Sequence, residues 1–579
     1  MRSVRLNISI TYNPNFGELM KKIFFGAIMA AMMFVNAKAL NAELLDVAKS
    51  EMQRAYQELQ KQSQPPYYIG YSITDVYNRR LSSSFGKIET ADSNRTRVLD
   101  IDLRVGSPAL DNTHIIRGQR MSFSIAPTSF ALPIEDNSTA IKKDIWLATD
   151  RVYKSALETF DKVVTNKKVK VAEEDSSADF SIEKPVQYSE PVKEINIDWA
   201  KWEDLVNRVS AEFLKDNRIY FGKVSLSLET LVKYYLATDG TEIRQFQPFI
   251  RIYISGSTKA DDGMSLPLYK SYFAFSPEQM PSEATLMKDV NELMATLKQL
   301  REAPLMTTYS GPALMSGEAS GVFFHEIFGH RVEGHRQKDP DDAQTFKNSL
   351  NQLVISPVID VTFDPTINEM NGKILSGYYK FDDEGIPSQR VSVVERGIFK
   401  NFLMSRSPIQ GFEHSNGHGR KEYGSKACSR QSNLIVKSEK IMSMSDLRRL
   451  LLDEAKKQGK EFALYFVDVQ GGFTFTGRAI PNSFNVNPLL VYKIYVDGRP
   501  DEMVRGVDLI GTPLTTFSHI VASADDFGVF NGICGAESGS VPVSACSPTL
   551  MVSKIEVQKK KKSQAKLPIL DAPQSNVNP

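Results

Sequence analysis

Apolar and polar positions follow two different periods along the chain, and each period predicts one kind of element. Apolar residues three to four positions apart are typical of amphipathic helices. We expect helices at residues 42–62, 145–164, 199–214, 282–301, 317–330 and 443–457. Alternating apolar and polar residues are typical of strands, which we expect at residues 67–105 and 223–255. The boundary signals are Pro65-Pro66 after the first helix, the turn Thr238-Asp239-Gly240-Thr241 and Ser282 as an N-cap.

The character of the chain changes near residue 304. Long helices and strands predominate before this point, whereas Gly, Pro and short β-type runs become frequent after it. We therefore expect an α+β fold, with an N-terminal α/β domain at residues 42–303 and a β-rich C-terminal domain at residues 304–557. The helix at 317–330 would lie near the start of the second domain. Residues 173–194 are charged and poor in large apolar groups, which predicts a surface excursion.

Residues 20–39 have the three parts of an export signal peptide. Met20-Lys21-Lys22 is a positive start, residues 23–35 are an unbroken apolar run, and Ala37-Lys38-Ala39 offers a cleavage site. The apolar run is shorter than the roughly 20 residues of a transmembrane helix. We therefore expect an exported, periplasmic bacterial protein with no stable membrane anchor after cleavage. Residues 1–19 would be an upstream extension, and the true start codon stays open.

Composition narrows the classes of protein that fit this pattern. The 579 residues include 70 Lys and Arg and 69 Asp and Glu, for a formal net charge of +1. This balance argues against a nucleic-acid partner, because nucleic-acid binders concentrate basic residues. The four consecutive lysines in the tail at residues 558–579 fit a disordered, solvated end. Only seven His and three Cys are present, and an odd number of Cys leaves at least one thiol to explain.

Three of the seven histidines lie close together, at positions 325, 330 and 335. His325-Glu326-x-x-x-His330 is similar to the zinc-peptidase pattern H-E-x-x-H, with one extra residue. On an ideal α-helix the shorter spacing places the two imidazoles about 40° apart, and the longer spacing places them about 140° apart. A π-type turn would restore convergence. Gly329 would either ease that distortion or let the chain leave the helix.

Two interpretations of this motif stay open. In the first, His325 and His330 bind Zn²⁺, and Glu326 accepts a proton from the activated water and delivers it to the leaving amine. In the second, the histidines are core residues and the glutamate caps the helix. Catalytic zinc usually has three protein ligands, and the local sequence does not identify the third. The candidates for it are His335, Glu333, Asp339 and a distant Cys.

Further motifs resemble those of the TldD/PmbA family of metallopeptidases. They keep the family's order over residues 300–555, whereas the match before residue 300 is weaker. Besides the histidine motif with Glu333-Gly334, they are Leu300-Arg301-Glu302-Ala303-Pro304, Tyr309-Ser310-Gly311-Pro312, Asp382-Asp383-Glu384-Gly385-Ile386-Pro387, Asn416-Gly417-His418-Gly419-Arg420, Gly506-Val507-Asp508-Leu509-Ile510-Gly511, Gly532-Ile533-Cys534-Gly535, Val541-Pro542-Val543 and Ser547-Pro548-Thr549-Leu550.

The resemblance implies that His325 and His330 ligate one Zn²⁺ per chain and that Cys534 is the third ligand. It also implies an N-terminal α/β domain followed by a β-rich metallopeptidase domain with the zinc helix near its start. Family members form dimers around a cavity that admits flexible peptides. The expected substrate is therefore a peptide or unfolded polypeptide bound along a sheet edge, and the expected assembly is a homodimer or a heterodimer with a related subunit.

Three further residues of these motifs have two interpretations each. Asp383 and Arg420 could orient the substrate or a zinc ligand, or they could belong to a turn and a flexible loop. His418 is a candidate for stabilising an oxyanion, although a loop histidine is more often solvated.

The chain also departs from the family pattern. Family members are cytosolic, whereas this chain carries an export signal, and the insert at residues 165–195 is unusual. Cys546 stands where a small residue is expected. Cys428 and Cys546 could form a disulfide after export, or they could be reduced thiols of the core.

The leading hypothesis is an exported zinc metallopeptidase in which Glu326 activates water. The first alternative is a non-catalytic, peptide-binding subunit of a TldD/PmbA-type dimer. The second is a protein that stores zinc or uses it only for structure.

Overall fold

The computed structural model describes residues 44–116, 128–169, 175–474, 484–510, 513–560 and 567–570. The predicted extension at 1–19, the signal peptide at 20–39 and most of the tail at 558–579 lie outside these residues. Among the described helices, none combines the length and apolarity that crossing a membrane requires. The prediction of an α+β fold with a β-rich C-terminal half is confirmed.

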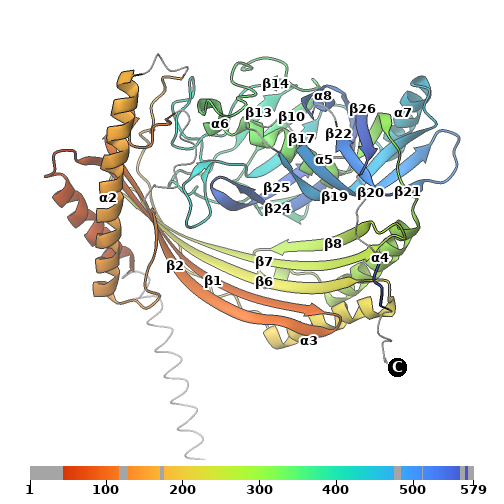
Figure 1. Ribbon diagram of the computed structural model, residues 1–579, viewed down its shortest axis with the longest axis horizontal. Helices are drawn as coiled ribbons and strands as arrows, with labels where there is room; N and C mark the ends of the chain where they lie inside the picture. The colour runs from red at the N-terminus through yellow and green to blue at the C-terminus, as the bar shows by residue number, and fades with distance from the viewer. Residues whose placement is uncertain are drawn as a thin grey trace, which may run out of the picture.

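The N-terminal half is built on one long, curved sheet, which forms the lower layer in Figure 1. Its strand order is β3-β2-β1-β6-β7-β5, with β4 on β2 and β8 on β7. The strands are β1 Pro66–Ser84, β2 Lys87–Ser107, β3 Leu110–Asp111, β4 Ser129–Ala131, β5 Gln187–Ser189, β6 Phe221–Ala237, β7 Glu242–Lys259 and β8 Ser265–Ala274. The predicted strand regions are each a hairpin, because β1 turns into β2 and β6 into β7.

Helices cover the outer face of this sheet and bury its apolar side chains. A first helix spans residues 44–59. The others are α2 Ser138–Val169, α3 Trp199–Ala211 and α4 Glu283–Glu302, with short 3₁₀ turns η1 Glu212–Lys215 and η2 Pro277–Gln279. Leu293 and Leu297 of α4 pack with Ile252 of β7 in one core, and Ile145 of α2 packs with Tyr71 of β1 in another. Ser282 caps α4 as predicted, since its Oγ accepts the Thr285 N–H at 3.2 Å.

The C-terminal half has two larger sheets. The first has the order β18-β23-β26-β9-β19-β20-β21, with β22 on β26, and the second has the order β14-β13-β10-β17-β25-β24. The strands of the first are β9 Tyr309–Met315, β18 Ile441–Met442, β19 Phe462–Thr474, β20 Phe484–Tyr495, β21 Glu502–Val504, β22 Val507–Ile510, β23 Ile520–Ala524 and β26 Leu550–Lys559. Those of the second are β10 Ile359–Phe363, β13 Val391–Glu395, β14 Ile398–Phe399, β17 Asn433–Ser438, β24 Gly528–Ala536 and β25 Gly539–Ser547.

Smaller elements complete this half. Two short hairpins pair β11 Glu369–Met370 with β12 Lys373–Ile374 and β15 Gly419–Arg420 with β16 Cys428–Ser429. The helices are α5 Gly317–Ile327, α6 His335–Lys338, α7 Met444–Lys457 and α8 Pro513–Ser518, with the 3₁₀ turn η3 Gly329–Val332.

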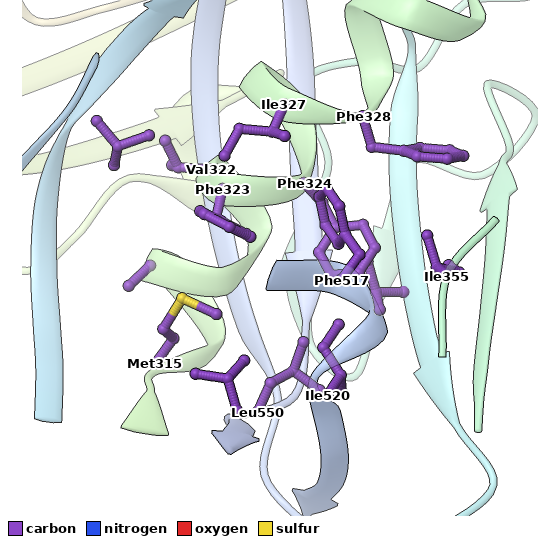
Figure 2. Close-up of a cluster of buried hydrophobic side chains, with 14 of the residues drawn as sticks. Met315, Val322, Phe323, Phe324, Ile327, Phe328, Ile355, Phe517, Ile520 and Leu550 are labelled. Carbon is purple, nitrogen blue, oxygen red and sulfur yellow. The ribbon is translucent and has the colours of Figure 1, made fainter. Parts of the chain in front are cut away.

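Helix α5 lies between the two sheets and carries His325 and Glu326, the first half of the histidine motif. It contacts β19 of the first sheet and β24 and β25 of the second. Figure 2 shows its side chains Phe323 and Phe324 pointing into a cluster with Phe517, Ile520 and Leu550. Because α5 is covered on both sides, nearly all of its residues are buried and its position is rigidly determined.

The predicted surface excursion at residues 173–194 is wrong at residues 179–181, which are buried, whereas residues 182–194 lie at the surface as expected, at exposed or half-buried positions. Phe180 is buried between the guanidinium groups of Arg104 and Arg406, at 3.8 and 4.1 Å from its ring centroid. Residues 187–189 form β5, which pairs in parallel with β7. The polar residues around Phe180 are paired with both halves of the protein, and for this reason the low apolar content did not indicate exposure.

Candidate metal centre

The first two predicted ligands are brought together by a break in the helix. The side chain of Ser316 caps the start of α5, and the last helical turn closes with the Phe328 N–H donating to the Phe324 carbonyl at 3.0 Å. The chain then enters η3, which carries His330. The π-type turn is therefore not formed, and the alternative exit from the helix is what occurs. The two imidazole centroids lie 5.1 Å apart.

Gly329 stands at this exit for a steric reason. A Cβ at this position would lie 1.9 Å from the Gln431 side-chain oxygen. The Gln431 side-chain amide in turn donates to the His325 carbonyl at 3.1 Å, which occupies a backbone acceptor near the end of the helix. The Arg331 guanidinium donates to the Ile327 carbonyl at 2.5 Å. The close contact with Gln431, rather than a flexible backbone, explains the glycine.

Cys534 completes a group of three buried side chains with His325 and His330. It lies on β24, and its Sγ is 3.5 Å from His330 Nε2. One ligand atom from each of the three side chains falls within 4.8 Å of the other two. Of the other candidates for the third ligand, Glu333 accepts a hydrogen bond from His330 Nδ1, the ring nitrogen that does not face Cys534, and His335 pairs with Glu537.

Two observations fit a metal ion held by this group. His325 Nδ1 is buried and has no hydrogen-bond partner within the part of the chain that the structure describes. Burial raises the pKa of Cys534, but the two imidazoles outweigh it and bring this pKa well below its usual value. Two imidazoles and a thiolate are a donor set typical of Zn²⁺ sites, and a cation there would take the place of a proton.

A buried charge network fixes the orientation of His330. Its Nδ1 donates to Glu333 at 3.1 Å, which directs Nε2 toward Cys534. Burial raises the pKa of Glu333, but His330 and Arg336 outweigh it and bring the pKa to about 2. The Arg336 Nε donates to the same carboxylate at 2.8 Å. Glu333 is therefore a charged acceptor that holds the ring in place.

Arg430 positions the third ligand. Its guanidinium is fully buried and donates to the carbonyl of Cys534 at 2.6 Å and to the Ser538 hydroxyl at 2.7 Å. It also lies 3.6 Å from the Glu333 carboxylate. Arg430 therefore links the backbone of β24 to Glu333, which is the residue that orients His330.

Glu326, the predicted catalytic residue, lies next to these ligands with its carboxylate unengaged. It follows His325 on α5 and is 7% exposed. Its carboxylate forms neither a hydrogen bond nor an ion pair with any residue in the described ranges. The group is available to a water molecule or a substrate, and the interpretation as a capping residue has no support in these contacts.

Asp383 lies at the junction of the two halves rather than beside the ligands. Its carboxylate accepts the Lys233 ammonium of β6 at 2.7 Å and the Lys421 N–H at 2.9 Å. Burial raises its pKa, but Lys233 outweighs it and the pKa is lowered.

Arg420 lies between the junction and the candidate metal centre. Its guanidinium donates to the Gln431 carbonyl at 2.5 Å and covers the ring of Tyr379 at 4.7 Å. Arg420 and Asp383 both line a cavity of about 170 Å³ between the halves.

His418 is buried, and the expectation of a solvated loop histidine is wrong. Its Nδ1 contacts the Asn416 carbonyl and its Nε2 contacts the Ser432 hydroxyl, each at 3.1 Å. Burial lowers its pKa to about 3, so the ring is neutral. Both ring nitrogens have partners in the loop, which leaves no free donor for an oxyanion.

The three cysteines are all free thiols. Cys546 packs among the apolar residues Leu375 and Ile435, and burial raises its pKa to about 12. Cys428 lies elsewhere, beside His335. Of the two alternatives for Cys428 and Cys546, the structure has the reduced thiols and not the disulfide; Cys546 belongs to the core, whereas Cys428 is only partly buried.

The supporting residues Gln431, Arg430 and Arg336 carry no local signal in the sequence. Gln431 and Arg430 lie about a hundred residues from the groups they contact, in a stretch without an evident motif. Their roles arise only when β16 and β17 are brought against α5.

Comparisons with known proteins give relatives for the C-terminal half. Residues 308–559 match the PmbA/TldA metallopeptidase C-terminal domain. A "Metalloprotease TldD homolog" of Haemophilus influenzae is 26% identical over 363 residues, which are 59% of this chain and 68% of that protein. A "Metalloprotease" of Archaeoglobus fulgidus is 28% identical over 261 residues, 45% of this chain and 56% of that protein. The chain thus spans about half the length of several curated relatives that it matches.

Solved structures show the same fold over most of the chain. TldE from Thermococcus kodakarensis aligns with a TM-score of 0.58 at 13% identity, over 88% of this chain and 99% of that one. A Thermotoga maritima protein described as a candidate modulator of a DNA gyrase aligns with a TM-score of 0.56 at 15% identity, over 88% of this chain and 99% of that one. The domain matched at residues 308–559 and the curated relatives described as TldD homologs support membership of the TldD/PmbA family, and the solved structures add the shared fold.

Proposed function

We propose that this protein is a zinc-dependent metallopeptidase that hydrolyses peptides or unfolded polypeptides. The observation that carries the proposal is the convergence of His325, His330 and Cys534 beside the unengaged carboxylate of Glu326. The printed descriptions of relatives as metalloproteases, and of one Saccharolobus solfataricus relative as a zinc metalloprotease TldD homolog, support the same class. One Zn²⁺ at these three ligands is part of the proposal.

Each residue of the site would have a distinct role. A zinc ion, when bound, supplies a Lewis acid that polarises a carbonyl and lowers the pKa of water. Glu326 removes a proton from the attacking water and later gives it to the leaving nitrogen of the cleaved bond. Glu333 and Arg430 hold His330 and Cys534 in position, so their effect on the reaction is indirect.

The substrate would lie in the space between the N-terminal sheet and β24. Ile533, next to Cys534, is 57% exposed and lines two cavities, of about 170 and 570 Å³. Side chains of β7 and β8 form the opposite wall of the larger cavity. The linings mix aromatic and polar groups, which fits a peptide of varied sequence.

Binding of a peptide as an added strand on β24 has less support than binding in these cavities. The carbonyls of Asn531 and Gly532 accept hydrogen bonds from Arg251, and that of Cys534 accepts one from Arg430. These acceptors are already engaged, so an added strand could not use them without displacing an arginine. We therefore propose that side-chain contacts in the cavities hold the substrate.

The variant Glu326→Gln tests the proposal. We expect it to keep zinc and the wild-type melting temperature, and to lose at least about a hundredfold in the rate of peptide hydrolysis. The measurement is a digest of a peptide library read by mass spectrometry, with zinc content determined on the same samples. Glu318→Gln is the matched control, because it makes the same exchange in the first turn of the same helix. Full activity of Glu326→Gln would contradict the mechanism.

Export and dimerisation are further parts of the proposal. The signal-like residues 20–39 support a periplasmic location, and the fold shared with TldE supports an assembly with a second copy or a related subunit. Cell fractionation tests the periplasmic location, and light scattering on the mature protein tests the dimer. A purified dimer with an intact metal and no hydrolysis of any unfolded substrate would favour the non-catalytic, peptide-binding subunit instead.

A further inference from the structure

A second group of metal-binding side chains lies close to the first. It consists of His335 at the start of α6, Cys428 on β16 and Glu537 in the turn between β24 and β25. One ligand atom from each falls within 4.8 Å of the other two. The proposed hydrolysis uses none of these three residues.

The contacts of His335 are incomplete without a further partner. Its Nε2 touches a carboxylate oxygen of Glu537, and its Nδ1 is buried with no hydrogen-bond partner among the described residues. A buried ring nitrogen without a partner is costly, and a cation coordinated within the group would remove part of this cost.

The group is accessible from solvent, unlike His325, His330 and Cys534. The side chain of Glu537 is 45% exposed and that of His335 is 20% exposed, while Cys428 is partly exposed. An ion could therefore enter without unfolding of the surrounding elements, and water could fill a fourth coordination position.

The surrounding contacts hold the three side chains in place. Cys428 is paired with Arg420 in the β15–β16 hairpin. The second carboxylate oxygen of Glu537 accepts the Arg336 guanidinium at 2.9 Å, and Arg336 in turn binds Glu333, which orients His330. The second group is thus connected to the first through one arginine.

We infer that His335, Cys428 and Glu537 form a second metal site that binds Zn²⁺ or a similar divalent ion. Imidazole nitrogen, thiolate sulfur and carboxylate oxygen together suit ions of borderline softness and disfavour Mg²⁺ and Ca²⁺. Tetrahedral Zn²⁺ places its ligand atoms roughly 3.3–3.6 Å apart, so the Glu537 carboxylate moves away from the His335 ring when the ion enters. The inference does not depend on peptidase activity.

The experiment counts metal ions in the mature protein and in variants of each site. The wild-type protein, equilibrated with Zn²⁺ and freed of excess metal, should carry two ions per chain. Cys534→Ser should carry one, and adding His335→Ala or Cys428→Ser to it should bring the number close to zero. His414→Ala is the matched control, since this histidine is 70% exposed and belongs to neither group. Circular dichroism verifies that each variant is folded.

Cobalt substitution gives a second measurement that does not depend on stoichiometry. In the Cys534→Ser protein, Co²⁺ should show a thiolate-to-metal charge-transfer band from Cys428, and Cys428→Ser should abolish it. Glu537→Gln alters a half-exposed side chain with little risk to folding, and should weaken metal binding about tenfold or more.

Two results would overturn the inference. One is a Cys534→Ser protein that is folded and binds no metal. The other is a Cys534→Ser protein whose remaining metal and cobalt band persist after His335→Ala and Cys428→Ser. A wild-type protein that carries two ions but hydrolyses nothing would support the second site while contradicting the proposed function, so the two failures are distinguishable.

Discussion

At residue 329 the fold leaves no space for a side chain. The helix must end here so that His330 can face His325, and the Gln431 amide occupies the space beside the Gly329 Cα. Because Gln431 is itself held by the His325 carbonyl and by the surrounding β-strands, it has little freedom to move. The spacing of the motif therefore depends on a residue about a hundred positions away.

We expect Gly329→Ala to lower the free energy of unfolding by about 1–3 kcal/mol and to weaken zinc binding, since the new methyl group displaces Gln431. Chemical denaturation and zinc competition measure the two effects. Gly535→Ala is the control, because no atom lies within 4 Å of its added Cβ and the change should cost little. Equal behaviour of the two variants would show that Gly329 is not needed for steric reasons.

Asp468 on β19 is a second residue whose surroundings lead to a prediction, in this case about the pH dependence of stability. Burial and the nearby Glu318 raise its pKa to about 6, above the value of about 3.9 for an unfolded chain. The folded protein therefore binds this proton more tightly, and the carboxylate lowers stability as pH rises from about 4 to above 6.

We expect Asp468→Asn to raise the free energy of unfolding at pH 7.5 by on the order of 1–2 kcal/mol, and by less at pH 4.5. Asparagine can still accept the Val469 N–H that Asp468 binds at 2.7 Å. Urea denaturation at the two pH values measures the difference. A gain that is the same at both pH values, or a loss at pH 7.5, would contradict this account of Asp468.

At the level of elements, the junction between β6 and the loop at residues 382–385 joins the two halves. Lys233 and Asp383 form an ion pair at 2.7 Å, with side chains only 20% and 10% exposed. A pair so enclosed is costly to break, because the remaining charge stays buried without its partner. Asp383 thus stabilises the wall of the cavity in which we place the substrate.

We expect Lys233→Met and Asp383→Asn each to lower stability by about 1–3 kcal/mol, and the double variant to lower it by less than the sum. A double-mutant cycle in urea measures this coupling. If Asp383 also binds substrate, Asp383→Asn will raise KM by more than Lys233→Met does, although both residues line the cavity. Additive effects on stability would mean that the two residues are not coupled.

The helices show what a hydrophobic pattern can and cannot predict about the bounds of an element. Helices α4 and α7 follow the predicted segments because their apolar stripes and capping residues are local features, whereas α2 extends beyond the predicted residues 145–164 at both ends. The sequence predicts one helix at residues 317–330, since Phe328 continues the apolar pattern. It ends at Ile327, where Gln431 and Arg331 donate to the carbonyls of His325 and Ile327, and the contact with the distant Gln431 is one that no local pattern reveals.

For the molecule as a whole, the fold class followed from the change in composition near residue 304. The candidate site was only partly predictable. His325, His330 and Glu326 are evident from their motif, whereas Cys534 is indicated only by the resemblance to the family. Arg430, Arg336 and Gln431 were missed because burial and charge pairing give them their roles only in the folded protein.

Removal of metal should destabilise the whole molecule, because the three ligands belong to α5, η3 and β24. At free zinc about a hundredfold above its dissociation constant, binding contributes about 2.7 kcal/mol to stability. We expect a chelator to lower the melting temperature of the wild-type protein more than that of Cys534→Ser. The His335 group is present in both proteins and so cancels in the comparison. Equal shifts in calorimetry would contradict a metal at Cys534.

The long separation between the ligands has a consequence for when the centre can form. Cys534 follows His330 by 204 residues, near the end of the folded chain. During synthesis, and during passage through a secretion channel that carries unfolded chains, the two histidines and the cysteine cannot meet. On the proposed export route the centre would then be loaded after translocation. The ion that binds would then depend on which metals are available outside the cytoplasm, and not on those available where the chain is synthesised.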